Sequence, residues 1–152
     1  MNDIVPPSAT VQTDATRILA RHVVNTQFED LNERAVHSFK RTLLDYLTTA
    51  LTGAQEPVSQ AMLEYLASVD TACTSAIIGS PRRLSVLNAA LVNGTSTHAL
   101  DFDDGHTNGS AHPAGPNFPA VLAVAEQKGL PAGNGSDSNV ICYNLLAIAI
   151  RQ

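Results

Sequence analysis

The feature that most constrains the fold is a long amphipathic helical pattern in the first third of the chain. Apolar residues recur three and four positions apart, as on one face of a helix, at Val36, Phe39, Leu43, Leu44, Leu47 and Leu51. Asp30 and Glu33 stand in capping-box spacing, and Gly53 can supply a left-handed stop. The pattern predicts a helix from about Asn32 to Leu51, whose apolar face must pack against other elements.

Most of the remaining chain also has the spacing of helices. We expect further helices after Thr13 or Asp14, from Pro57 to Leu66, from Ser85 through Gly94 as far as Phe102, from Pro116 to Gly129, and over residues 140–150. Residues 74–78 can form an extended segment, and residues 103–116 a loop. The sequence therefore predicts a mainly α fold resembling part of a helical bundle.

The domain organisation follows from length and composition. Residues 1–12 are polar and contain a Pro-Pro pair, so we expect a flexible N-terminal arm followed by a single helical domain over 13–152. Only 15% of the residues are charged, compared with about 25% in typical domains. This low fraction, and an apolar element that stops at the terminus, suggest an incomplete, truncated domain with surface that missing chain or a second subunit covers.

Charge and hydropathy exclude some partners. The nine basic and fourteen acidic residues give a net charge of -5, so no long basic stripe is available for nucleic acid. The longest apolar run, residues 140–150, is shorter than the roughly 20 residues of a membrane span. The N-terminus lacks the features of a secretory or transit signal, so we expect a cytoplasmic protein. Cys73 and Cys142 lack CxxC spacing, and we interpret both as reduced, buried residues.

The segment from residue 98 to residue 112 is the part of the chain with the composition of a reaction site. It holds three of the five histidines and three of the fourteen acidic residues, namely His98, Asp101, Asp103, Asp104, His106 and His112. A histidine can donate and accept protons near neutral pH, and a nearby carboxylate can orient its ring. These residue types suit proton transfer.

A continuous helix would decide which of these side chains meet. If the helix extends to Asp104, His98 and Asp101 fall on one side with Asp104 beside Asp101, and Asp103 points away. The structural alternative is a solvated helix end with a packed His98. Three carboxylates at a helix C-terminus, however, oppose the macrodipole by roughly 0.3–1 kcal/mol each, which favours a functional role.

A metal site is the competing chemistry for the same residues. Histidine and aspartate three residues apart are standard ligands for zinc or iron, and the aspartates could also bind a hard cation. No HExxH motif or cysteine pair supports such a site. We therefore expect no metal at this site.

The string NGTSTHALDFDDGH, followed by HPAGP and PAVLAVAEQKG, resembles the signature of the MmgE/PrpD family. The preceding segments FEDLNERAVHSFKRTLLDYLTTALTG and IIGSPRRLSVLNAALVNGT are similar to the family's second helix and to its approach to that signature. The family contains 2-methylcitrate dehydratases, cis-aconitate decarboxylases and an iminodisuccinate epimerase. The resemblance implies a large helical domain with a smaller α/β domain, usually in a dimer, acting on di- or tricarboxylic acids without a cofactor.

The resemblance also implies roles for individual residues. The first aspartate of the DFDD string and the histidine of the following HP pair line the family's active site, and they match Asp101 and His112 here. His112 would donate or accept the proton, and Asp101 would position its neighbours and the substrate. His98, Asp104 and His106 would support these two residues or contact the substrate.

Two departures from the family pattern bear on these roles. The loop before His112 is about one residue longer than in some relatives, and Gly105 replaces a common hydroxyl-bearing residue, so the position of His112 is open. Family members are also considerably longer than this chain, and their further catalytic histidine and lysine residues lie beyond its last residue.

Three functional hypotheses follow. The first is an N-terminal fragment of a carboxylic-acid lyase, a dehydratase or decarboxylase that uses general acid/base catalysis and is inactive alone. The second is an epimerase of the same family with an iminodisuccinate-like substrate. The third is a non-catalytic remnant that acts only through helix packing, as a homodimer or with a full-length relative.

Overall fold

The structure is a computed structural model that describes residues 14–26, 28–105 and 111–129. The expected arm over residues 1–12, the expected helix over residues 140–150, His106 and Cys142 lie outside the described residues. The expectation that both cysteines are buried is wrong for Cys73, whose side chain is exposed.

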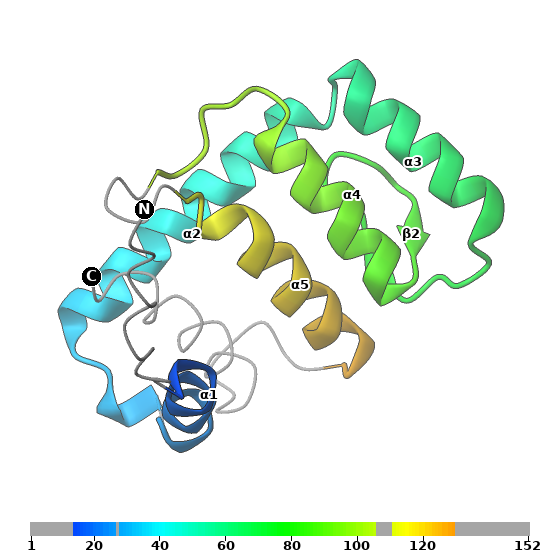
Figure 1. The fold of residues 1–152 in the computed structure, drawn as a ribbon. Coiled ribbons are helices and arrows are strands. Elements are labelled where there is room, and N and C mark those ends of the chain that lie inside the picture. Colours follow the sequence, from blue (N-terminus) through cyan, green and yellow to red (C-terminus); the bar gives the residue numbers. More distant parts are fainter. Residues whose placement is uncertain (1–13, 27, 106–110, 130–152) are drawn as a thin grey trace, which may run out of the picture.

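The described chain is mainly α-helical, as the sequence predicts. The helices are α1 (Ala15–Asn25), α2 (Glu33–Gly53), α3 (Pro57–Val69), α4 (Val86–His98) and α5 (Ala114–Gln127), with a short 3-10 turn at Phe28–Asp30. Two short strands, β1 (Ser75–Ala76) and β2 (Arg83–Leu84), pair antiparallel. Figure 1 shows α4 and α5 side by side against the long α2, with α3 beyond α4 and α1 set apart from these four helices.

Helix α2 forms where the sequence predicts it, but its ends differ from the prediction. The side-chain oxygen of Asn32 accepts a hydrogen bond from the backbone N–H of Ala35 at 2.9 Å, so Asn32 is the cap. Asp30 belongs to the preceding 3-10 turn and does not form the expected capping box. Gly53 is the last helical residue rather than a left-handed stop.

Gly53 serves a close crossing of two helices. A Cβ atom built on Gly53 would lie 1.9 Å from the backbone oxygen of Ser96, far inside van der Waals contact. Only glycine therefore allows α2 and α4 to approach this closely at that point.

Only part of the predicted apolar face of α2 is buried: Phe39 lies in the core, and Val36 and Leu43 pack against it. The buried residues of α2 are Phe39, Tyr46, Thr49, Ala50 and Gly53, whereas Leu44, Leu47 and Leu51 are exposed. Helix α2 thus carries an apolar stripe of three leucines that the described chain leaves uncovered.

Helix α5 connects the two halves of the core. Phe118 lies against Phe39 and stacks on Tyr46 of α2, with the last two ring centroids 5.1 Å apart. Further along the same helix, Ala123 packs in a second cluster with Leu63 and Leu66 of α3 and with residues of α4 and the strands. The start of α5 is therefore anchored on the Tyr46–Phe118 contact.

The connection between α3 and α4 is organised by Asp70. Its Oδ2 accepts hydrogen bonds from the N–H and the hydroxyl of Ser85 and from the Asn88 amide, and its Oδ1 accepts one from the N–H of Ala72. The Ser85 hydroxyl therefore binds Asp70 instead of capping α4. These bonds hold the pKa of Asp70 well below its ordinary value.

Within the described part of the chain, none of the helices is both long and apolar enough to cross a membrane.

Candidate acid/base site

The C-terminal end of α4 differs from the expected continuous helix. The helix passes through Gly94 but ends at His98, so it does not reach Phe102. Asp101 has a left-handed backbone with φ 53°, and its N–H donates to the carbonyl of His98 at 3.1 Å. Because the chain turns here, its carboxylates do not accumulate in the last turn of the helix, where the macrodipole disfavours them.

This turn places Asp103 inward, contrary to the expectation that it points away. The side chain of Asp103 is 1% exposed, and its Oδ1 lies 3.0 Å from Nδ1 of His98 and 3.5 Å from Nδ1 of His112. The two imidazole rings meet edge to face, with centroids 5.0 Å apart. We call His98, Asp103 and His112 the carboxylate–imidazole cluster.

The burial of Asp103 depends on a small residue opposite it. A Cβ atom at Gly115 would lie 3.3 Å from Oδ2 of Asp103 and 3.8 Å from Cγ2 of Thr97. Asp103 Oδ2 is buried and has no hydrogen-bond partner among the described residues. The carboxylate is therefore seated between α4 and α5 with a single oxygen, Oδ1, left for the two rings.

The neighbouring Asp104 holds the first residue of the following helix. Its Oδ1 accepts a hydrogen bond at 2.9 Å from the N–H of Ala114, one of the amides that lack a partner within α5. Burial raises the pKa of Asp104, and the charges of Asp103 and Asp45 add to this effect. The hydrogen bond from Ala114 and the proximity of His112 act in the opposite direction.

The cluster borders an open pocket of about 400 Å³. Small and apolar residues form most of its walls, and the histidines supply polar groups at one side. The lining residues are Ala90, Leu91, Gly94, Thr95, His98, Asp103, His112, Gly115 and Pro116. A pocket of this kind can hold the carbon skeleton of a small molecule next to two imidazoles.

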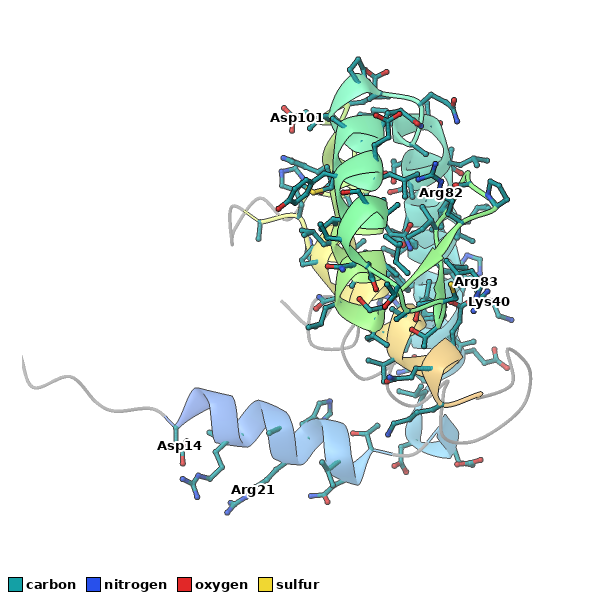
Figure 2. All side chains as sticks on the ribbon, turned by 90° about the vertical axis from the view of Figure 1, so that its right-hand side faces the viewer. Asp14, Arg21, Lys40, Arg82, Arg83 and Asp101 are labelled. Carbon is teal, nitrogen blue, oxygen red and sulfur yellow. The ribbon has the colours of Figure 1, made fainter. Side chains whose placement is uncertain are left out.

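The predicted site residues are brought together only in part. His98 and His112 meet through Asp103, and Asp104 lies beside them at the start of α5. Asp101 is exposed, and Figure 2 shows it at the outer end of α4. Its carboxylate makes no hydrogen bond or ion pair within the described residues, and its expected role of positioning the substrate stays a prediction.

The helical spacing of the sequence does not indicate that Asp103 belongs to the site. Another signal for it was present, because three carboxylates in a last helical turn are unfavourable and therefore indicate that the helix ends earlier. A helix that ends at His98 leaves four residues before Asp103, and the turn through Asp101 brings the Asp103 carboxylate back to the His98 ring.

The donor set of the cluster is also one that metals accept. One ligand atom each from His98, Asp103 and His112 lie within 4.8 Å of one another, and two imidazoles with a carboxylate suit zinc or iron. Asp103 Oδ1 and His98 Nδ1 also form a hydrogen bond, with Nδ1 of His112 at the longer distance of 3.5 Å from the same oxygen. The arrangement therefore suits proton transfer by the imidazoles.

Comparisons with known proteins point to one family. Residues 17–147 match the model of the MmgE/PrpD N-terminal domain. Human cis-aconitate decarboxylase is 33% identical over 97 residues, which are 63% of this chain and 20% of that protein. The cis-aconitate decarboxylase of Aspergillus terreus is 28% identical over 102 residues, 67% of this chain and 21% of that protein.

A third relative is similar over a longer stretch. The cis-aconitate decarboxylase-like protein oryM of Aspergillus oryzae is 27% identical over 118 residues, which are 78% of this chain and 24% of that protein. The chain thus spans about a quarter or less of the curated relatives that it matches.

Proposed function

Because the chain belongs to the MmgE/PrpD family, we propose that it forms the N-terminal part of a cofactor-independent lyase acting on a di- or tricarboxylic acid. The observation that carries this proposal is the carboxylate–imidazole cluster at the edge of a pocket, in a chain similar to cis-aconitate decarboxylases. Within the same lyase class, the alternative to a decarboxylase is a dehydratase that acts on a 2-methylcitrate-like acid.

The reaction needs a group that moves a proton. When a carboxylate leaves as carbon dioxide, the electron pair of the broken bond remains on the substrate, and a general acid must deliver a proton there. In a dehydration, a base removes a proton from carbon and an acid protonates the departing hydroxyl. An imidazole serves either role near neutral pH.

We assign the proton transfer to His112. Its side chain is 42% exposed at the pocket, so a substrate can reach the ring, while Asp103 holds the ring from the buried side. By family resemblance Asp101 contacts the substrate from the turn after α4. His98 and Asp104 support the site, His98 through Asp103 and Asp104 through the start of α5.

A substitution at His112 tests this assignment. We expect His112→Asn to reduce turnover of cis-aconitate or 2-methylcitrate at least 100-fold, the lower range for loss of a general acid/base. Proton NMR of substrate and product, together with carbon dioxide release, measures the reaction. His37→Asn is the matched control, because His37 is an exposed histidine on α2 outside the pocket.

The 152-residue chain is assayed first alone and then mixed with a full-length relative whose own copy of the same histidine is replaced. Because the chain spans so little of its relatives, we expect turnover only in the mixture. Equal turnover of the His112→Asn and parent chains in that mixture would contradict the proposal. A chelator such as EDTA should leave the turnover unchanged, whereas its loss would indicate metal chemistry.

An epimerase with an iminodisuccinate-like substrate is the alternative within the same family. An epimerase needs two acid/base groups on opposite faces of one carbon atom, whereas His98 and His112 are neighbours that share a carboxylate oxygen. The cluster supplies acid/base groups at one place only, so a panel of carboxylic-acid substrates is the measurement that separates the epimerase from the lyase.

We propose that the chain associates with a second copy of itself. The support is the exposed stripe of Leu44, Leu47 and Leu51 on α2, since apolar patches on a surface commonly mark contact sites. Association with a full-length relative through the same stripe is the other outcome. The location in the cytoplasm stays a prediction from the sequence.

A further inference from the structure

We infer that Asp103 is the positioning residue of this site, and that it holds His98 and His112 in the tautomer with the proton on Nδ1 and a free lone pair on Nε2. The inference deepens the proposed function, because it rests on proton transfer by His112. It assigns a role to a residue that neither the spacing of the sequence nor the family resemblance singled out.

The first step is the chemistry of the shared oxygen. An ionised carboxylate can only accept hydrogen bonds. Oδ1 of Asp103 faces Nδ1 of His98 at 3.0 Å and Nδ1 of His112 at 3.5 Å. A neutral imidazole that donates from Nδ1 must carry its lone pair on Nε2, at the other side of the ring.

The second step is the burial of the carboxylate. The side chain of Asp103 is 1% exposed, whereas the side chains of His98 and His112 are 58% and 42% exposed. Oδ2 is buried near Gly115, so Oδ1 is the oxygen that faces the two rings. A buried anion with one accessible oxygen directs both rings far more strictly than a surface aspartate would.

The third step connects the tautomer to catalysis. A ring whose Nδ1–H is held by a carboxylate presents Nε2 as the atom that takes or delivers a proton, and the carboxylate stabilises the imidazolium that forms. His112 and His98 both line the pocket. Asp103 therefore acts on the substrate only through the rings that it orients.

The tautomers can be measured without any turnover. Long-range proton–nitrogen correlation spectra of the 15N-labelled chain, recorded at a pH where the imidazoles are neutral, distinguish Nδ1–H from Nε2–H rings. We expect His98 and His112 to be of the Nδ1–H type. His37, exposed on α2 and outside the cluster, should show the Nε2–H form common in free histidine and serves as the internal reference.

Two substitutions at Asp103 complete the test. In Asp103→Leu the acceptor is gone, so both rings should change to mainly Nε2–H. In Asp103→Asn, which keeps the shape if the leucine variant fails to fold, the amide can donate as well as accept, so at least His112 with its longer contact should lose its fixed tautomer. Asp101→Asn, at an exposed carboxylate two residues away, is the matched control and should leave both tautomers unchanged.

The inference is overturned if the parent rings are mainly Nε2–H, or if neither Asp103 variant changes them. Its failure is distinguishable from failure of the proposed function. Nδ1–H rings in a chain whose His112→Asn variant loses no turnover would remove the lyase proposal and leave the role of Asp103 intact. Lost turnover in that variant, with tautomers that do not depend on Asp103, would do the reverse.

Discussion

At the scale of single residues, two consecutive aspartates after α4 have different tasks. The side chain of Asp103 is buried and lies beside the rings of His98 and His112, whereas Asp104 accepts a hydrogen bond from the backbone of α5. Their spacing in the sequence could not assign these tasks, because the assignment depends on a left-handed residue, Asp101, that redirects the chain. A non-glycine residue in that conformation carries no strong signature in one sequence.

Alanine substitutions at two glycines that face neighbouring helices should change the free energy of unfolding in opposite directions. Gly53→Ala places Cβ against the Ser96 oxygen and should lower the free energy of unfolding by about 1–3 kcal/mol, the usual cost of overpacking. Gly94→Ala is the matched control inside α4, where the nearest atom would be an ordinary 3.5 Å away. It should stabilise by about 0.4–1 kcal/mol, because alanine has less backbone freedom to lose.

Urea unfolding followed by circular dichroism measures both changes. A Gly53→Ala variant as stable as the parent would mean that α2 and α4 do not cross as closely as described.

At the scale of elements, the sequence predicted where helices form better than which faces they bury. Leucines marked the apolar face of α2, yet the buried positions include Tyr46, Thr49 and Ala50. Small residues permit close approach and aromatic residues fill the space beside it, so burial follows the neighbouring helices rather than residue hydrophobicity alone. Contacts between distant segments, such as the Ser75 hydroxyl with the Ala123 carbonyl, have no local signal at all.

The hydrogen bonds of Asp70 should make the link between α3 and α4 sensitive to acid. Its pKa is lowered in the folded state, so its stabilising effect is complete above the ordinary value of 3.8 and is lost as the pH falls toward the lowered pKa. We expect Asp70→Asn to lower the midpoint of urea unfolding at pH 7. The difference from the parent should shrink as the pH falls below 3.8.

Glu64→Gln, at an exposed carboxylate of the same helix, is the control for Asp70. A pH-independent difference between the Asp70→Asn and parent midpoints would show that packing, and not the charged hydrogen bonds, accounts for the effect.

The anchoring of α5 by Asp104 has the opposite dependence on pH. Its pKa is raised mainly by burial, so the folded state keeps the proton longer and this side chain contributes less stability as the pH rises through the raised pKa. Asp104→Asn keeps an oxygen for the Ala114 N–H without the buried charge, and at pH 7 it should be at least as stable as the parent.

Asp104→Ala removes the acceptor and should cost about 0.5–2 kcal/mol, as the loss of a helix cap does. Thermal unfolding compares the two Asp104 variants with the parent. Equal destabilisation by asparagine and alanine would mean that the charge itself is needed.

At the scale of the whole molecule, the sequence predicted the mainly α architecture, and the low charged fraction predicted uncovered surface. The leucine stripe of α2 is such a surface, with Leu44 67% and Leu51 56% exposed. The sequence could not identify it as uncovered, because the same spacing is typical of a core-facing helix.

The stripe should support concentration-dependent association. We expect sedimentation of the parent to show dimers that a Leu44→Glu, Leu51→Glu double variant converts to monomers, because each charge is costly to bury at an apolar contact. Leu87→Glu on α4 introduces the same charge at a leucine that is 82% exposed, and it should leave the dimer intact. A monomeric parent, or an equal effect of Leu87→Glu, would remove the stripe as the contact surface.

The contacts that Asp103 and Asp104 make across the loop before His112 bear on how the length of this loop can vary. Asp103 lies beside His112, and Asp104 binds the N–H of Ala114, so both aspartates contact the chain directly after the loop. The loop that these contacts span is about one residue longer than in some relatives. The extra residue before His112 is compatible with these contacts, so the histidine of this chain still lies beside the buried Asp103.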